Sequence, residues 1–439
     1  MAATDQQMDV RIQHRQFRLD NGLTLLVHED RSLPLLAVNL WYRVGSGHES
    51  PGRTGFAHLF EHLMFEGSAH VPAGAFDHLL EAVGGTNNGS TSTDRTNYWI
   101  NAPTHALELA LWLESDRMGY LLETMTQAKL DLQRDVVMNE RRQSYENRPY
   151  GLAWETLVGN LFPLGHPYHH PVIGSMADLE AASLEDVRAF FRTWYAPNNA
   201  TLAIAGDVDA ERAHDVVQRW FGDLPAGAPV PRAELPPIAG PRDARLVMED
   251  SVQLPRLYLG WRSPAHYTEA DADMEMLAAV LADGKSARLY QRLVYDEQIA
   301  QDVSVFQSGA AVDGTFEIVV TAKPDVALPA IEDVVREELA RVVVAGIGSD
   351  EMERALAQVE AGFVQALERG GGFGGKADRL NEYLVFAGDA DFARRDLARF
   401  QRATPASVAE AARRHLIEHA GVTLSVVPAG RRDLAAEAA

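Results

Sequence analysis

The stretch Gly55-Phe-Ala-His58-Leu-Phe-Glu61-His62-Leu-Met-Phe65 decides how the first half of this chain is interpreted. Its apolar residues recur at helical spacing, and residues three and four apart lie on one face of a helix. His58, Glu61 and His62 are therefore expected to point toward the same region. Neutral imidazole is a good zinc ligand, and a catalytic zinc takes three protein ligands with a carboxylate nearby to accept a proton. The spacing thus predicts a zinc site, with a hydrogen-bonded pair of core histidines as the alternative.

A zinc site of this kind needs a third ligand from another part of the chain. Residues 127–145 have the apolar spacing of a second helix. The polar residues of this segment that are able to face inward are Gln133, Glu140 and Glu146. Geometry alone leaves the choice between the two glutamates open.

The composition is that of a globular protein whose 439 residues are enough for two domains. The formal net charge of −22 argues against nucleic acid as a partner, because phosphate binding needs a basic surface. No membrane span is expected, since no run approaches roughly 18 apolar residues. The N-terminus shows no export signal, so a periplasmic location with the signal removed and a cytoplasmic location both stay open. The absence of cysteine excludes disulfides and thiolate ligands.

Prolines crowd residues 225–242, which predicts a linker between two domains at residues 1–224 and 243–439. Both halves follow the same order of strand, strand and helix, and the second half has no histidine in the corresponding helix. We expect an α+β fold of two similar domains, each a mixed or antiparallel sheet packed with helices. The strands expected in the first half are residues 23–28, 35–44, 96–100 and 200–206, and its helices are 55–65, 74–83, 104–118 and 127–145. The second half is expected to have strands at 245–248, 256–261 and 422–427 and helices at 270–281 and 350–369.

A polar, glycine-rich segment from Gly84 to Asp94 precedes the strand expected at residues 96–100. Such a segment is typical of a sheet edge with free backbone groups. An edge of this kind either is protected or binds an extended peptide by strand addition. An ordinary hairpin arm is the alternative.

Two other motifs are not assigned a function. Residues 370–376 have the spacing of a phosphate-binding loop, but Ala377 stands where Ser or Thr is needed, and the motif follows a helix and not a strand. A flexible loop that lies between the domains or faces the substrate is the better interpretation. His166, His169 and His170 lie among prolines without an acidic partner nearby, so a surface loop is expected there.

Several motifs together resemble the pitrilysin family of metallopeptidases, in the branch similar to mitochondrial processing peptidase. The resemblance covers nearly the whole chain, and the His-x-x-Glu-His order is the inverzincin signature. The motifs that carry it are Asn21-Gly22-Leu23, Gly45-Ser46-Gly47, His58 to His62, Gly84 to Ser92, Pro197-Asn198-Asn199 and Gly206-Asp207-Val208.

The resemblance implies a zinc metalloendopeptidase that hydrolyses peptides or short unfolded polypeptides with water activated at the zinc. It makes His58 and His62 zinc ligands and Glu61 the general base. The third ligand of a single zinc per chain falls on Glu140, with Glu146 as the nearest competitor. The two domains would form half of a clam-like chamber.

The same resemblance implies that the peptide substrate adds as a strand along Asn88 and Gly89. It also places Gln133 where many relatives carry a second acidic residue behind the metal, so Gln133 is expected to support the ligands.

The chain departs from the family in its second half. Active single-chain members, and the partner subunits of two-chain members, carry an Arg and, seven residues later, a Tyr that reach the substrate. Val294 and Gln301 stand at those positions, and neither can stabilise an oxyanion as Arg or Tyr would. Arg292 and Tyr295 are close in sequence but out of register.

This departure predicts the zinc-bearing subunit of a bacterial-type heterodimer, whose metal-free paralogous partner supplies the Arg and the Tyr. A homodimeric peptidase is one alternative. A non-catalytic structural or binding subunit, similar to the core proteins of the cytochrome bc complex, is the other. The intact set of His58, Glu61, His62 and Glu140 favours the enzyme.

Overall fold

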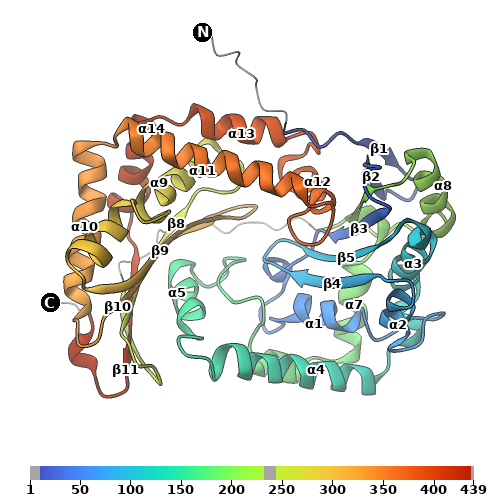
Figure 1. Cartoon of the computed structure of the whole chain (residues 1–439). Coiled ribbons are helices and arrows are strands. Elements are labelled where there is room, and N and C mark those ends of the chain that lie inside the picture. The colour runs from blue at the N-terminus through green and yellow to red at the C-terminus, as the bar shows by residue number, and fades with distance from the viewer. Residues whose placement is uncertain (1–9, 232–243, 437–439) are drawn as a thin grey trace, which may run out of the picture. The chain divides into compact units, whose positions relative to one another are not determined.

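The computed structural model describes residues 10–231 and 244–436, which fall into two compact units (Figure 1). The described part of the first unit is residues 10–137, 172–231 and 361–397, and that of the second is residues 138–171, 244–360 and 398–436. Each unit is one sheet packed with helices, which confirms the α+β class.

The compact units differ from the predicted domains by two exchanged segments. Residues 138–171 belong to the unit of the second sheet, and residues 361–397 belong to the unit of the first. The ranges 1–224 and 243–439 stay a prediction for the domains, and most of the predicted linker at 225–242 lies outside the described residues.

The first unit is built on a six-stranded mixed sheet with the strand order β1-β2-β6-β3-β5-β4. The parallel pair is β2 with β6, and the other pairs are antiparallel. The central strands β3 and β6 are buried along nearly their whole length, whereas β4 is an edge strand, as the glycine-rich segment predicts. The strands are β1 (Arg15–Arg18), β2 (Thr24–Glu29), β3 (Leu35–Tyr42), β4 (Thr86–Thr91), β5 (Thr96–Pro103) and β6 (Ala200–Gly206).

The second unit repeats this plan in a five-stranded sheet with the order β7-β11-β8-β10-β9. Its parallel pair, β7 with β11, corresponds to β2 with β6, and its edge strand β9 corresponds to β4. The predicted similarity of the two halves is confirmed at the level of strand order. The strands are β7 (Ala244–Asp250), β8 (Arg256–Ser263), β9 (Ala300–Gly309), β10 (Gly314–Ala322) and β11 (Val422–Pro428).

The α-helices are divided between the two units, and three of them continue from one unit into the other. The helices of the first unit are α1 (Phe56–Leu63), α2 (Ala75–Glu81), α3 (Leu107–Thr124), α6 (Met176–Ala181), α7 (Leu184–Trp194), α8 (Ala210–Phe221) and α12 (Lys376–Glu382). The helices of the second are α5 (Ala153–Leu161), α9 (Glu269–Ala282), α10 (Leu328–Ala345) and α14 (Pro405–Ala412). The continuing helices are α4 (Gln127–Arg141), α11 (Ser349–Glu368) and α13 (Ala393–Arg402). Among the described residues, none of the helices is both long enough and apolar enough to cross a membrane.

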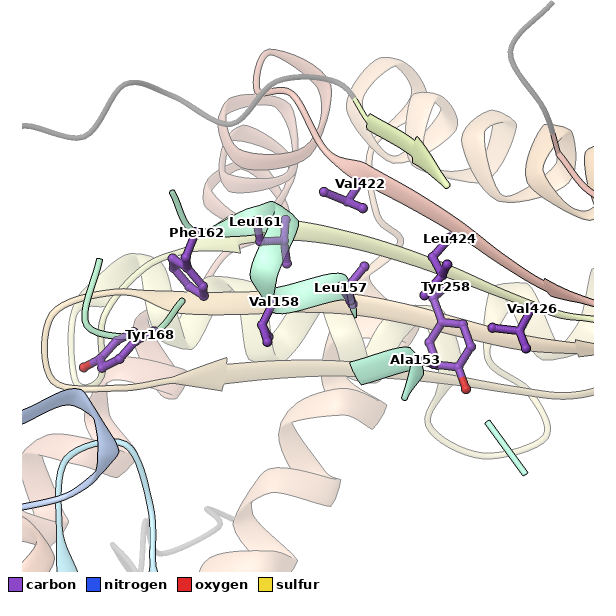
Figure 2. Packing of buried hydrophobic residues seen from close by; sticks show 10 residues of the cluster. All are labelled: Ala153, Leu157, Val158, Leu161, Phe162, Tyr168, Tyr258, Val422, Leu424 and Val426. Carbon is purple, nitrogen blue, oxygen red and sulfur yellow. The ribbon is translucent and has the colours of Figure 1, made fainter. Parts of the chain in front are cut away.

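Helix α5 belongs to the second unit because its apolar face is buried against the second sheet. Figure 2 shows Leu157 and Leu161 among the buried side chains that face Tyr258 and Leu424. Gly260 lets the helix approach closely, since a Cβ atom there would lie 3.0 Å from Leu157. Each buried leucine contributes roughly 2 kcal/mol to this packing.

The surface loop predicted around His166 is wrong for that residue. His166 is 3% exposed and stacks on Phe162 with 4.5 Å between ring centroids. Burial lowers the pKa of His166 to about 4, so the ring is neutral at physiological pH. The cause is the apolar core in which Phe162 and Tyr168 pack with Tyr258, a distant residue that the local sequence does not reveal.

Helix α12 belongs to the first unit because it packs on the first sheet. Its residue Leu380 is buried in a cluster with Leu26 and Ala203. The Asp378 carboxylate accepts hydrogen bonds from Trp41 Nε1 at 2.8 Å and Asn97 Nδ2 at 3.0 Å. A buried carboxylate with several donors fixes the position of the helix on the sheet.

Candidate metal centre

Helix α1 begins at a carboxylate that satisfies its first backbone donors. Gly55 precedes the helix with φ of 89°, in the left-handed region that favours glycine. The Glu49 carboxylate accepts hydrogen bonds from the backbone N–H of Gly55 at 2.8 Å and of Ala57 at 2.7 Å. Burial raises the pKa of Glu49, and the backbone donors oppose that shift. Glu49 therefore holds the start of the helix that carries the histidines.

The two faces of α1 differ in burial. The apolar face, which includes Leu59 and Leu63, is fully buried. His58, Glu61 and His62 are half-buried on the other face, with the two imidazole ring centroids 4.8 Å apart. The predicted juxtaposition of these side chains is therefore present.

Glu140 on α4 completes a group of potential metal ligands. One ligand atom each from His58, His62 and Glu140 lies within 4.8 Å of the others, and the described residues form no second group of three or more such side chains. The division between the two units falls inside α4, and the continuous helix carries Glu140 one turn past it. Glu146 is exposed, forms an ion pair with Arg141 at 3.4 Å and is not part of the group.

The donor set fits zinc. Two imidazole nitrogens and one carboxylate oxygen are ligands that catalytic zinc prefers. A tetrahedral ion with bonds of about 2.0–2.2 Å holds its ligand atoms about 3.4 Å apart. A separation of at most 4.8 Å between the ligand atoms is therefore closed by small side-chain rotations.

The edge strand β4 lies directly against Glu61. Thr91 Oγ1 donates a hydrogen bond of 2.6 Å to Glu61 Oε2. At Gly89 a Cβ atom would lie 3.1 Å from Glu61 Cγ and 3.2 Å from Tyr98 Cδ1, so the close approach favours glycine. The residues predicted from the sequence include Gly89 but not Thr91. The one feature of the sequence that indicates Thr91 is its place two residues after Gly89, on the same face of the strand.

Asn88 points to the other side of the sheet edge. It is exposed, and its Oδ1 accepts a hydrogen bond of 2.8 Å from the backbone N–H of Gly89. No described strand pairs with the outer side of β4. Asn88 and Gly89 thus lie where a further strand could add.

Gln133 links the two ligand-bearing segments. Its Nε2 donates a hydrogen bond to Glu66 Oε1. Gln133 lies two turns before Glu140 on α4, and Glu66 lies four residues after His62. The amide therefore ties the segment that follows α1 to the helix that carries Glu140.

Among the described residues of the second unit, Arg292 and Tyr295 are the candidates for the Arg and the Tyr that lie close in sequence to the expected positions. Val294 is half-buried in the π-helical segment Tyr290–Asp296, and Gln301 is exposed on β9. Tyr295 is 68% exposed. Arg292 is held by three carboxylates, those of Glu297, Glu337 and Glu338.

A duplicated sheet-and-helix fold with His58, His62 and Glu140 around one point and Glu61 beside it defines the class of metallopeptidase-like proteins. Comparison with known families agrees with this class. Residues 25–163 match the model of the insulinase family, peptidase family M16, and residues 181–359 match the M16 inactive domain. The chain belongs to peptidase family M16.

Relatives and solved structures of similar length support this assignment. The zinc protease PqqE of Helicobacter pylori is 29% identical over 360 residues, covering 81% of this chain and 80% of that protein. An uncharacterized zinc protease of Streptomyces coelicolor, SCO5738, is 26% identical over 91% of this chain and 86% of its own length. The crystal structure of a protease from Helicobacter pylori matches with a TM-score of 0.88 and 25% identity, covering 95% of this chain and all of that one. The first half of the periplasmic protease PqqL of Escherichia coli has the same fold, with a TM-score of 0.78 and 20% identity over 94% of this chain and 92% of that one.

Proposed function

We propose that the chain is a zinc-dependent endopeptidase that cleaves peptides or short unfolded polypeptides. The observation that carries this proposal is the convergence of His58, His62 and Glu140 beside Glu61. Two relatives whose names identify them as zinc proteases, similar over most of the chain, support it. One zinc ion per chain is expected, because the described residues hold one such ligand group.

The roles of the side chains follow from their positions. Zinc, when bound, would lower the pKa of a water molecule and polarise the scissile carbonyl. Glu61 accepts the proton of that water and later passes it to the leaving amine. The hydrogen bond from Thr91 fixes the orientation of the Glu61 carboxylate for both transfers. Gln133 keeps α4, and with it Glu140, in place relative to the segment after α1.

The substrate is expected to bind as an added strand on β4. The outer side of β4 is not paired by any strand of the described residues, and Gly89 brings this edge next to Glu61. Backbone hydrogen bonds along Asn88 and Gly89 would hold an extended peptide with little dependence on its sequence. Most segments of a folded protein are already paired or packed, so short or unfolded chains are the expected substrates.

A metal-free paralogous partner is expected to complete the site. Val294 and Gln301 stand at the positions expected for the substrate-binding Arg and Tyr, and Arg292 is engaged by carboxylates. Adding the purified partner should raise peptidase activity strongly, and light scattering should show a heterodimer. Full activity of the isolated chain, unchanged by the partner, contradicts the heterodimer, and a dimer of this chain alone would favour the homodimeric alternative.

Hydrolysis of internally quenched fluorogenic peptides tests the proposed activity. The rate should vanish when a chelator removes the metal and return when zinc is added back. A chain that binds zinc but cleaves no peptide, alone or with the partner, would instead be a structural or binding subunit.

A further inference from the structure

The edge of the first sheet has a second face that the proposed chemistry does not use. Gly89 and Thr91 of β4 face Glu61, and Asn88 faces the opposite side. Asn88 pairs with Trp99 of β5, which therefore lies on that opposite face one strand further in. A peptide added to β4 places alternate side chains on the two faces.

The opposite face carries an exposed aromatic side chain next to the sheet edge. The ring of Phe373 meets the ring of Trp99 edge-on, with centroids 5.6 Å apart and planes at 90°. Phe373 is 41% exposed although it is large and apolar. It belongs to the glycine-rich segment 370–376, for which the sequence favours a loop between the domains or facing the substrate over a phosphate-binding loop.

This segment is held firmly on the sheet. The backbone N–H of Lys376 donates to the carbonyl of Arg369 at 2.8 Å, and that of Gly374 donates to the Asp378 carboxylate at 2.8 Å. At Gly371 a Cβ atom would lie 2.0 Å from Asn101 Oδ1, so the backbone approaches β5 as closely as glycine allows. The glycines thus bring Phe373 onto Trp99 and keep it there.

The spacing between strands determines which substrate side chains can contact the rings of Phe373 and Trp99. Neighbouring strands lie about 4.8 Å apart, so a residue that pairs with Asn88 on an added strand lies about 10 Å from Trp99, with Asn88 between them. An aromatic side chain of the added residue, on the same face, is long enough to contact the exposed ring of Phe373 beside Trp99. A short polar side chain is not. Aromatic rings prefer such edge-on and offset contacts.

We propose that Phe373 and Trp99 form a specificity subsite for an aromatic side chain of the substrate, on the face of the sheet edge opposite Glu61. The inference rests on the proposed peptidase function and names a class of substrate for it. The aromatic residue is the one that pairs with Asn88, so it stands at a fixed number of residues from the cleaved bond. Asn88 is the positioning residue between the subsite and the edge.

Binding of labelled peptides tests the subsite without requiring turnover. Fluorescein-labelled decapeptides of Ser, Gly and Ala with one central Phe or Ser are titrated against zinc-loaded chain carrying Glu61→Gln, and anisotropy gives the Kd. The Phe peptide should bind about three- to tenfold more tightly than the Ser peptide. Phe373→Ala in the same background should abolish that ratio, and Val364→Ala, which truncates a side chain also 41% exposed, should keep it.

The position of the cleaved bond is a second measurement, independent of the binding ratio. Mass spectrometry of products from the otherwise unchanged chain, with the partner present, should show a fixed spacing between Phe and the cut bond, and Phe373→Ala should scatter it. Equal binding of the Phe and Ser peptides, or a ratio that survives Phe373→Ala, overturns the subsite. If the binding ratio depends on Phe373 but no peptide is hydrolysed, alone or with the partner, the subsite is supported and the peptidase is refuted. Zinc-dependent hydrolysis without a Phe373-dependent binding ratio supports the peptidase and refutes the subsite.

Discussion

Replacing Glu317 by Gln should stabilise the second unit at alkaline pH. Glu317 lies on β10 and is 7% exposed, and the one partner described for its carboxylate is the hydroxyl of Thr315 at 2.7 Å. Burial raises the pKa of Glu317 to about 7 from an ordinary value of 4.5. A buried carboxylate with so little compensation disfavours the ionised form.

The sign and the size follow from proton linkage. Because the folded-state pKa is raised, the unfolded chain ionises first, so the stability present below about pH 4.5 is lost as the pH rises toward 7. The pKa of Glu317 differs by about 2.5 between the folded and the unfolded chain. This difference corresponds to a total loss of about 3 kcal/mol in the free energy of unfolding, of which about 2 to 3 kcal/mol falls between pH 5 and pH 8. The amide that replaces the carboxylate in Glu317→Gln is neutral at every pH, so the variant should not show this loss of stability.

Urea unfolding at about pH 5 and pH 8 measures the effect. The free energy of unfolding of the Glu317→Gln variant should exceed that of the unsubstituted chain by about 1 kcal/mol or less at pH 5 and by about 3 kcal/mol at pH 8. Glu332→Gln is the matched control, since Glu332 is 4% exposed and its pKa is lowered by hydrogen bonds from Arg245 and Arg336, which outweigh burial. This control should be less stable than the unsubstituted chain at neutral pH, with a difference that shrinks as the pH falls. A Glu317→Gln difference that is the same at both pH values refutes the reasoning.

Five further substitutions at four positions concern the metal centre and the helix that carries it. Glu140→Gln should weaken zinc binding at least about tenfold in a chelator competition, whereas Glu146→Gln should leave it unchanged. Thr91→Val should lower kcat about tenfold with zinc content unaltered, and Thr91→Ser should restore the rate, because only the hydroxyl is needed. Glu49→Ala should lower the free energy of unfolding by about 1 to 3 kcal/mol, since two backbone donors of the first unit lose their acceptor. Loss of zinc from Glu146→Gln, or unchanged stability of Glu49→Ala, would contradict these assignments.

Much of the fold was predictable because its signals are local. The apolar runs of β3 and β6 and the helical spacing of α1 predict those elements to within two residues, and the glycine-rich lead-in predicts the edge strand β4. The repeated order of elements predicts a second sheet of the same plan. Helix ends were less accurate, and α3 runs to Thr124 where the pattern suggested Met118.

The parts that were missed depend on contacts between distant residues. The burial of Asp378 among Asn39, Trp41 and Asn97 places α12 on the first sheet, and no local pattern reports a contact across more than 280 residues. His166 is buried because Phe162, on which it stacks, belongs to a core with Tyr258 and Leu424, which lie far away in the sequence.

At the candidate site, too, the sequence predicts the local arrangement but not the contacts between distant segments. The positions of His58, Glu61 and His62 follow from helical spacing, and Glu140 needed the resemblance. The hydrogen bonds from Thr91 to Glu61 and from Gln133 to Glu66 are set by strand pairing and helix packing, which the sequence pattern does not specify.

Zinc content and peptide hydrolysis of the unsubstituted chain and Glu61→Gln, each with and without the partner, test the central claim most directly. Both proteins should hold about one zinc per chain, because Glu61 is assigned as a base and not as a ligand. Hydrolysis by Glu61→Gln should fall at least about 100-fold. A Glu61→Gln variant that keeps both its zinc and full activity would contradict the assignment.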